Sequence, residues 1–228
     1  MTTARVPRSK TESRQTQLRR AQEQLRKADP VIGRFIERRP DFDPYAWLNE
    51  LPPMDLFGSL LFQIAGQQLS VAATRRTMER VRSLFSGHLP SPKEVLAVEA
   101  SDLRDAGFSW RKVATIRDLA ERFSDGRLDM DRLGKLSDDD FITELTAVPG
   151  IGPWTAQGAL LVALRREDVV LPGDLALRKA IRRSYELDHL PTQEEVLEIA
   201  EKWRPFRSLA TSYLFAAAYQ PEDGSATQ

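Results

Sequence analysis

Cysteine is absent from this chain of 228 residues, and histidine occurs only twice. Without cysteine, disulfides, thiolate zinc sites, cysteine nucleophiles and iron–sulfur clusters are excluded. His88 and His189 each precede a Leu-Pro pair in an expected loop, and nothing in the sequence places them together. We therefore expect both histidines on the surface rather than in a catalytic or metal site.

Long apolar runs are also lacking. No stretch approaches the roughly 20 apolar residues that a helix needs to cross a bilayer. The N-terminus is polar and basic and has no apolar core of a secretory signal. We therefore expect a protein that is not secreted and that works in the cytoplasm.

Net charge is zero, but the charges are unevenly distributed. Residues 1–40 carry 11 Lys and Arg against 4 Asp and Glu, a net of +7, and the rest carries 22 against 29, a net of −7. A basic arm of this kind is suited to meet a polyanion, although a solvated tail has the same composition. Residues 1–15 are polar and poor in apolar side chains, so we expect a basic disordered tail there.

Helical periodicity dominates the remaining sequence. Apolar residues recur at spacings of three and four within 70–86, 110–123 and 206–219. Glycine and proline separate these segments, and Ser70 is suited to cap the helix that follows it. The only stretch resembling a strand is the short "DVVLP" at 168–172. The pattern predicts an all-α protein of about ten helices.

The stretch "VPGIG" at 148–152 joins two of these expected helices. Residues 138–147 read as the first helix, and Pro153 stands where a second helix can begin without losing a hydrogen bond. Glycines allow a tight turn and close approach of the backbone to a ligand. A turn with glycines between two helices is also common without any ligand, so the turn alone leaves both interpretations open.

A phosphate is the ligand that this turn would suit best. The backbone N–H groups of Gly150, Ile151 and Gly152 lie at the start of a helix, where the helix dipole favours an anion. Thr155 adds a hydroxyl within the first turn, and no acidic residue occurs between Glu144 and Glu167.

Asp174 follows Pro172-Gly173 and precedes an amphipathic helix, in "VVLPGDLALRKAI" at 169–181. An aspartate there can be a helix cap that stabilises the helix by about 1 kcal/mol. An ionised carboxylate can also stabilise an oxocarbenium ion or orient a water molecule, as in glycoside hydrolysis. The sequence around Asp174 alone does not decide between these two roles.

Four stretches together give the chain a resemblance to the helix-hairpin-helix superfamily of DNA glycosylases. Within it the chain is most similar to the 3-methyladenine DNA glycosylase II group, which acts on alkylated purines. The stretches span about residues 45–220, and their combination and order are specific. They are "IAGQQLSVAAT" (64–74), "AGFSWRKVATIRDLA" (106–120), "LTAVPGIGPWTA" (145–156) continuing to "VVLPGDLALRKAI" (169–181), and "WRPFRSLATSYLF" (203–215).

The resemblance implies a set of site residues. Asp174 matches the catalytic aspartate, and Trp154 and Phe215 match aromatic walls of the base pocket. Phe62 or Trp110 could be further walls, although packing in the protein suits each of these two side chains as well. Gly158 stands where some relatives have tyrosine, which implies a wider or differently shaped pocket. Gln68 holds the position that enters the duplex, where some relatives have a large apolar residue. The implied DNA contacts are Gln67, Gln68, Leu69, Ser70, Gly150, Ile151, Gly152 and Thr155. The implied monovalent cation site, for Na⁺ or K⁺, is formed by the backbone carbonyls of Thr146, Val148 and Ile151.

Two departures from sister groups narrow the expected reaction. Relatives that also cleave the DNA strand carry a lysine where this chain has Trp154, so no amine is present there to form a Schiff base. Other relatives carry a four-cysteine cluster that this chain lacks. We expect a monofunctional glycosylase that needs no cofactor and acts as a monomer on double-stranded DNA containing alkylated bases.

The expected architecture is two helical lobes with the active-site cleft between them. One lobe combines 16–69 with 170–228, and the other spans 70–169 and ends in the helix-hairpin-helix at about 138–164. Three alternatives stay open from the sequence: a glycosylase of another lesion, a non-catalytic DNA-binding module that retains the hairpin, and a helical interaction protein unrelated to DNA.

Overall fold

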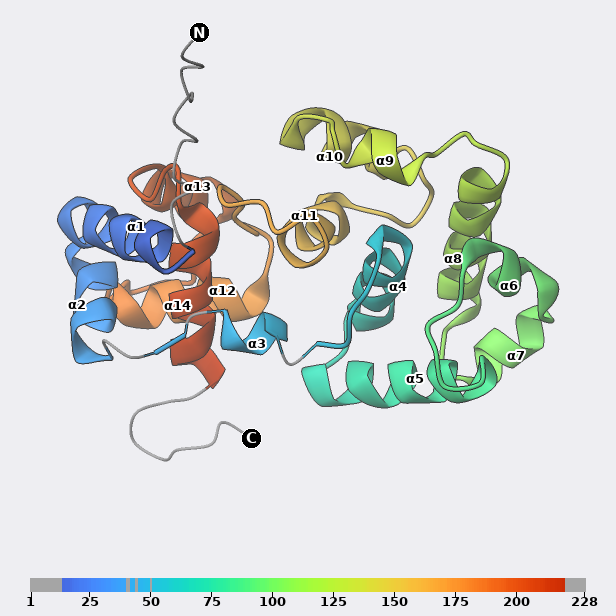
Figure 1. Cartoon of the computed structure of the whole chain (residues 1–228). Helices are drawn as coiled ribbons and strands as arrows, with labels where there is room; N and C mark the ends of the chain where they lie inside the picture. Colours follow the sequence, from blue (N-terminus) through green and yellow to red (C-terminus); the bar gives the residue numbers. More distant parts are fainter. Residues whose placement is uncertain (1–13, 40–41, 44, 50, 220–228) are drawn as a thin grey trace, which may run out of the picture.

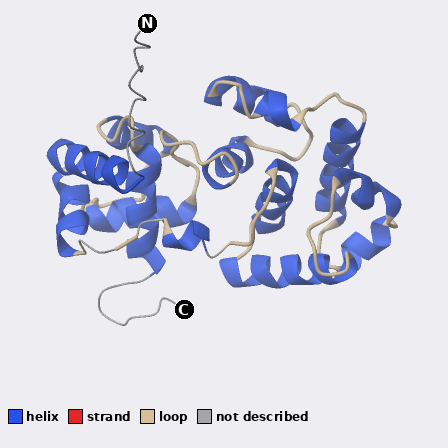
Figure 2. Cartoon of the chain, viewed as in Figure 1, coloured by secondary structure: helices blue, strands red, loops and turns tan. Residues whose placement is uncertain are grey.

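Fourteen helices make up the described part of the chain, and no strand occurs in it (Figure 1, Figure 2). The computed structural model describes residues 14–39, 42–43, 45–49 and 51–219. Ten of these helices have nine or more residues and match the expected number of about ten helices. The other four are short, with four or six residues each. The helices are α1 Arg14–Ala28, α2 Pro30–Arg38, α3 Ala46–Asn49, α4 Leu56–Gly66, α5 Val71–Leu84, α6 Pro92–Ala97, α7 Ala100–Asp105, α8 Trp110–Ser124, α9 Met130–Leu133, α10 Asp138–Thr146, α11 Pro153–Val162, α12 Leu175–Ser184, α13 Gln193–Glu201 and α14 Arg207–Tyr219.

Short polar side chains fix where many of these helices begin. Ser70 caps α5 by accepting from the N–H of Ala73, as predicted, and Ser109 and Ser137 cap α8 and α10 in the same way. Each such cap satisfies a backbone donor that the helix itself leaves unpaired. The predicted helix starts at these places are confirmed.

The helices gather into two lobes (Figure 1). One contains α1 to α3 with α12 to α14, in which α2 packs on α1 and α14, and α12 packs on α14. The other contains α4 to α11, because α4 packs on α5, α8 and α11, and α10 packs on α11. Residues 56–66 therefore side with the central segment, whereas the sequence analysis grouped 16–69 with the C-terminal helices. The apolar surface of α4 explains the difference, since nine of its eleven residues are buried.

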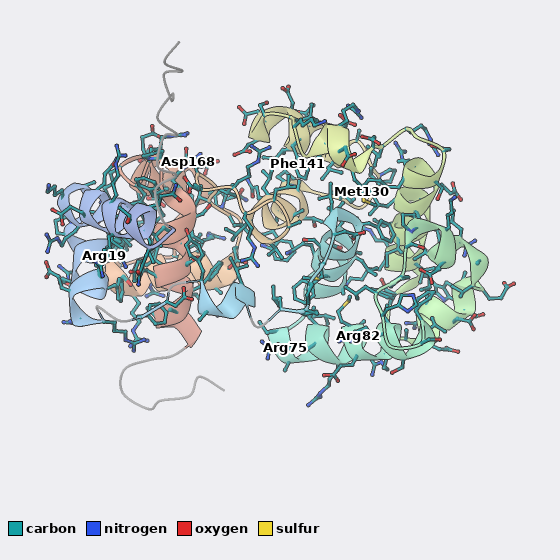
Figure 3. The ribbon with its side chains drawn as sticks, in the orientation of Figure 1. Arg19, Arg75, Arg82, Met130, Phe141 and Asp168 are labelled. Carbon is teal, nitrogen blue, oxygen red and sulfur yellow. The ribbon has the colours of Figure 1, made fainter. Side chains whose placement is uncertain are left out.

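The segment between α11 and α12 is fastened to α14. The Asp168 carboxylate accepts from Arg204 Nη1 at 2.6 Å and from Arg207 Nε at 2.7 Å. Asp168 lies where this segment meets the C-terminal helices (Figure 3). Ser208 adds two further bonds, from its hydroxyl to Arg166 O at 2.6 Å and from Val169 N to its hydroxyl at 3.0 Å. The "DVVLP" stretch is thus a buried connection rather than a strand, and it carries the chain to Asp174.

A buried carboxylate holds the first lobe together. Asp29 is fully buried and caps α2 by accepting from Val31 N at 2.8 Å. Its second oxygen accepts from Trp203 Nε1 at 2.6 Å and from the hydroxyl of Tyr185. Lys202 Nζ lies 3.3 Å from the same oxygen. One side chain thereby joins α2, the end of α12 and the segment before α14.

The predicted disordered tail lies almost entirely outside the described residues. Of 1–15, only residues 14 and 15 are described, and both belong to α1. Within the described chain, none of the helices combines the length and the apolar character needed to cross a bilayer.

Candidate active site

Asp174 and Trp154, twenty residues apart in sequence, meet where the two lobes join. Asp174 is the N-cap of α12, with Oδ1 accepting from Leu177 N at 2.9 Å. Its other oxygen, Oδ2, accepts from the indole Nε1 of Trp154 at 2.9 Å. Asp174 as a residue is only partly buried. We call these two residues the Trp154–Asp174 pair. The sequence predicted the cap and both residues, but not the hydrogen bond between them.

The position of Trp154 follows from the start of α11. Pro153 is the first residue of the helix, as predicted, and Trp154 is the second. A Cβ built on Gly66 would lie 3.9 Å from Cη2 of Trp154, so the six-membered end of the indole faces the end of α4. The ring therefore lies between α4 on one side and the Asp174 carboxylate on the other.

The hairpin between α10 and α11 has two free backbone donors. Val148 N donates to Leu145 O and Ile151 N donates to Val148 O, each at 3.0 Å. Within the described chain, the N–H groups of Gly150 and Gly152 have no acceptor. Ile151 therefore does not offer its N–H to a phosphate as predicted, because the turn itself uses that group. The anion site of the hairpin is reduced to the two glycine amides.

The loop after α4 is tied to this hairpin by one side chain. Gln67 Nε2 donates to Gly150 O at 3.1 Å and to Thr155 Oγ1 at 3.0 Å. Thr155 is 1% exposed, so its hydroxyl serves this bond instead of the predicted contact with DNA. The Gln67 amide is likewise used within the protein, where it anchors the loop to the hairpin, rather than to fill a gap in the duplex. The sequence carried no signal for this pairing, which joins residues 83 and 88 positions apart.

A lysine that the sequence analysis did not place in the site holds the same loop from the other side. Lys112 Nζ donates to Ala65 O at 2.9 Å and to Gln67 O at 2.8 Å. Both carbonyls lie at the C-terminal end of α4, where a cation is favoured by the helix dipole. Burial lowers the pKa of Lys112 below its ordinary value. Gln67 and Lys112 together form what we call the loop clamp.

The tip of the loop is exposed beyond the clamp. Gln68 has a φ of +58°, in the left-handed region, and its side chain is exposed. Leu69 is 44% exposed and Val71 48%. Ser70 is also exposed, but its hydroxyl is used as the cap of α5. Gln68 and Leu69 are thus the two members of the predicted contact set whose side chains project freely from the loop.

The other predicted pocket residues lie in different settings. Phe62 and Phe215 are partly buried and pack against the core, from α4 and α14. Trp110 begins α8 and is 59% exposed, so the expectation that it packs at the helix start is wrong. The place of Phe62, Phe215 and Trp110 in a base pocket stays a prediction.

Gly158 does not leave the open space that the sequence analysis expected. A Cβ built on Gly158 would lie 2.5 Å from both Cδ and Oε1 of Gln63 and 2.9 Å from its Nε2. The Gln63 amide therefore occupies the space that a side chain at 158 would need. The space beside Gly158 is thus filled from α4, and the shape of a base pocket there stays a prediction.

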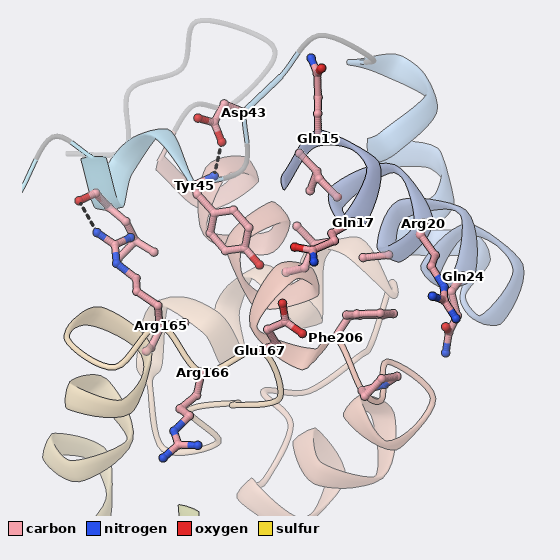
Figure 4. A pocket seen from close by; sticks show the side chains of 16 residues that line it. Gln15, Gln17, Arg20, Gln24, Asp43, Tyr45, Arg165, Arg166, Glu167 and Phe206 are labelled. Atoms are coloured by element: carbon pink, nitrogen blue, oxygen red, sulfur yellow. Dashed lines mark hydrogen bonds between the residues drawn. The ribbon is translucent and has the colours of Figure 1, made fainter. Parts of the chain in front are cut away.

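A broad groove lies elsewhere, between α1, α3, α14 and the segment after α11 (Figure 4). Its walls include Tyr45, Arg165, Glu167 and Phe206, and Arg165 Nη2 donates to Leu48 O at 3.2 Å (Figure 4). Neither member of the Trp154–Asp174 pair lines it. The groove is therefore separate from the candidate chemistry.

Metal chemistry by side chains has no support in the described residues. No group of three or more His, Asp or Glu side chains there could hold an ion. His88 is paired with Glu94, and His189 with Asp188 and Glu195, all on exposed surface. The predicted surface positions of the two histidines are confirmed.

The hairpin glycines allow a matched test of this local structure. Gly150 has a φ of +89°, and a Cβ there would lie 2.0 Å from Thr115 Oγ1. We expect Gly150→Ala to lower the free energy of unfolding by about 2–4 kcal/mol, since it combines backbone strain with overpacking. Gly152→Ala meets nothing within 4 Å and should change it by less than about 0.5 kcal/mol. Urea unfolding measures both, and equal effects would contradict the described turn.

Known proteins are similar to this chain both in sequence and in structure. Residues 62–205 match the model described as HhH-GPD superfamily base excision DNA repair protein. The chain is 30% identical over 202 residues to DNA-3-methyladenine glycosylase 1 of Schizosaccharomyces pombe, covering 88% of this chain and 87% of that protein. It is 27% identical to DNA-3-methyladenine glycosylase of Bacillus subtilis, covering 86% of this chain and 66% of that protein.

This chain thus spans just under two thirds of that longer relative, and it spans 63% of a second one from Bacillus subtilis. Among solved structures, the 3-methyladenine DNA glycosylase of Schizosaccharomyces pombe in complex with abasic DNA has a TM-score of 0.81 at 28% identity. That similarity covers 89% of this chain and 98% of the other chain.

Proposed function

Because the chain belongs to the HhH-GPD superfamily of base excision DNA repair proteins, we propose that it is a monofunctional glycosylase that releases alkylated purines from duplex DNA. The substrates are bases of the 3-methyladenine and 7-methylguanine type, and the product is an abasic site. The observation that carries the proposal is the Trp154–Asp174 pair, an aromatic ring and the carboxylate of a partly buried aspartate joined by a hydrogen bond of 2.9 Å beside the hairpin. The names of the relatives supply the lesion class.

The DNA is held mainly through its backbone. A phosphate accepts from the Gly150 and Gly152 amides, which are the two donors that the hairpin leaves free. Such contacts position the duplex without reading its sequence. The damaged nucleotide is turned out of the stack at a cost of a few kcal/mol. Gln68 and Leu69, exposed at the loop tip, enter the space that it leaves.

The extruded base is recognised first by its charge. A purine alkylated at N3 or N7 is cationic, and a cation over an aromatic face gains about 0.5–2 kcal/mol. Trp154 provides such a face, with Phe62 and Phe215 as further aromatic walls. A neutral, undamaged purine lacks this gain.

Asp174 acts at the sugar. The N-glycosidic bond breaks, its electron pair leaves with the cationic purine, and the purine becomes neutral. The carboxylate stabilises the positive charge that develops on the sugar, and a water molecule then adds to C1′ and loses a proton. Each Asp174 oxygen already accepts one hydrogen bond, which fixes the orientation of the carboxylate. No amine stands at residue 154, so strand cleavage through a Schiff base is not part of this reaction.

We also propose that the hairpin carbonyls hold a monovalent cation, Na⁺ or K⁺, in the complex with DNA. Within the described chain, the turn hydrogen bonds use the carbonyl oxygen of Val148 but not those of Thr146 or Ile151. Oxygen ligands of this kind suit such a cation. A bound cation would add positive charge next to the phosphate. The protein itself acts as a monomer on DNA, in the cytoplasm or the nucleus.

Base release from methylated DNA tests the function directly. We expect the purified protein to release free 3-methyladenine and 7-methylguanine from a methylated duplex, measured by chromatography of the soluble bases. The strand should stay intact until alkali cleaves it at the abasic site, because no lysine attacks the sugar. Equal release of bases from methylated and unmethylated DNA, or strand breaks before alkali treatment, would contradict the proposal. No release with duplex binding intact would leave another lesion or a binding role.

A further inference from the structure

Gln63 is a buried polar side chain whose amide packs over Gly158. It lies in α4 and is 7% exposed. Its side-chain amide makes no hydrogen bond within the described chain, whereas an amide removed from water without a partner costs stability. The unpartnered side-chain atoms that are fully enclosed belong to Ser59, Asp118, Thr211 and Ser212. The Gln63 amide is not among them, so it is not fully enclosed.

The amide lies one helical turn away from the Trp154–Asp174 pair. Gly158 follows Trp154 by four residues in α11, and Gly66 follows Gln63 by three in α4, so each pair shares one helix face. Gly66 faces the end of the Trp154 ring, and Gly158 faces the Gln63 amide. The contact between α4 and α11 therefore places the indole and the amide side by side. Only glycine at 158 leaves room for the amide there.

An amide offers one donor and one acceptor on the same edge. It forms two hydrogen bonds with a partner that presents an acceptor next to a donor, as the Hoogsteen edge of adenine does with N7 beside its amino group. On the same edge of 7-methylguanine the methyl group occupies N7 and O6 is an acceptor, so the amide can form only one hydrogen bond there, from its N–H to O6. An alkylated adenine presented by its Hoogsteen edge is thus the better partner for a fixed amide.

We propose that Gln63 reads the Hoogsteen edge of the extruded base and makes the site prefer alkylated adenine over 7-methylguanine. This inference rests on the proposed glycosylase function, because it assigns the specificity of that same pocket. Charge selects a damaged purine through Trp154, and the amide then distinguishes between the two purines. The unsatisfied amide of the free protein finds its partners in the bound base.

The first test compares two substrates in one pair of proteins. Gln63→Met keeps the length of the side chain and its fit over Gly158 but removes both hydrogen bonds. We expect single-turnover release of 3-methyladenine to fall by about tenfold or more, the range for a lost bidentate contact, and release of 7-methylguanine to change by less than about threefold. Equal losses for both bases, or no loss, would overturn the proposal. Urea unfolding of both proteins checks that the variant is folded.

The second test does not need catalysis. Equilibrium dialysis measures binding of free adenine, 7-deazaadenine and 1-deazaadenine to the protein on a duplex with an abasic-site analogue. We expect wild type to bind adenine about tenfold more tightly than 7-deazaadenine, and Gln63→Met to lose that difference. 1-Deazaadenine, which keeps N7, should bind like adenine, and weak binding of 1-deazaadenine alone would overturn the proposed reading of the Hoogsteen edge.

The two tests distinguish a failure of the proposed glycosylase function from a failure of the assignment of Gln63. If wild type releases no base but still shows the adenine preference, the glycosylase function fails and the assignment of Gln63 stands. If release occurs and the variant binds all three bases as wild type does, the assignment of Gln63 fails alone. Absence of adenine binding by wild type also overturns it.

Discussion

Replacing Asp174 with asparagine is expected to lower the single-turnover rate of base release by a factor of about 10² to 10⁴. The substitution keeps the shape of the side chain, and the amide oxygen of asparagine can still accept from Leu177 N and cap α12. It removes the negative charge that we propose acts on the sugar, and also the hydrogen bond from Trp154 Nε1, because the amide nitrogen of asparagine cannot accept. Trp154 is only partly buried, so stability and duplex binding should stay close to wild type while the chemical step slows.

Asp55 provides a matched control for this substitution. It caps α4 by accepting from Gly58 N at 2.7 Å, the same role that Asp174 has at α12, but it has no aromatic partner. Asp55→Asn should leave the rate of base release within about twofold of wild type. The rates are measured with enzyme in excess over methylated duplex, and binding is measured in parallel. If Asp174→Asn retains a tenth or more of the wild-type rate, the carboxylate is not the catalytic group.

The largest effect on folding is expected at Asp29. Its carboxylate accepts from Val31 N, Trp203 Nε1 and the Tyr185 hydroxyl while fully buried. Asp29→Ala leaves these donors unsatisfied, and we expect the free energy of unfolding to fall by about 3–5 kcal/mol. Asp129→Ala removes an exposed cap with a single bond to Arg132 N at 2.7 Å and should cost about 1 kcal/mol. Urea unfolding that gives the two variants equal losses would refute the role of Asp29.

The same carboxylate predicts how stability depends on pH. Burial by itself would raise the pKa of Asp29, but the hydrogen bonds from Tyr185, Trp203 and Val31 outweigh it, and the pKa lies below its ordinary value. The stability it contributes is therefore fully present above about pH 4 and is lost as the pH falls through the lower folded value. In urea titrations at decreasing pH, Asp29→Asn should lack this part of the acid destabilisation. If Asp29→Asn loses stability with acid as steeply as wild type, this contribution of Asp29 is contradicted.

Features set by neighbouring residues could be predicted from the sequence. The capping serines, the helix after Pro153 and the position of Asp174 all follow from local patterns, and the helical spacing gave the fold class. The pairings that shape the site could not be predicted in this way. Gln67 meets Thr155, and Gln63 meets Gly158, only because α4 packs on α11.

The sequence also did not predict which backbone amides of the hairpin stay free, or what fills the space beside a glycine. Three consecutive amides at the hairpin looked equally free, yet Ile151 N turns inward to Val148 O. A glycine at 158 looked like empty space, yet a side chain from another helix fills it. In both cases the deciding partner is fixed by the folded geometry and not by residue type.

The loop clamp has a thermodynamic consequence. Gln67 and Lys112 hold the loop through four hydrogen bonds before any DNA is present. The conformational entropy of this segment is therefore lost when the chain folds, not when it associates with a duplex. Ordering a loop on association would cost about 1–2 kcal/mol for each residue fixed. In the proposed function, every encounter with undamaged DNA thus begins with a loop that is already ordered, and we expect the deformability of the duplex, rather than that of the loop, to govern how readily a nucleotide leaves the stack.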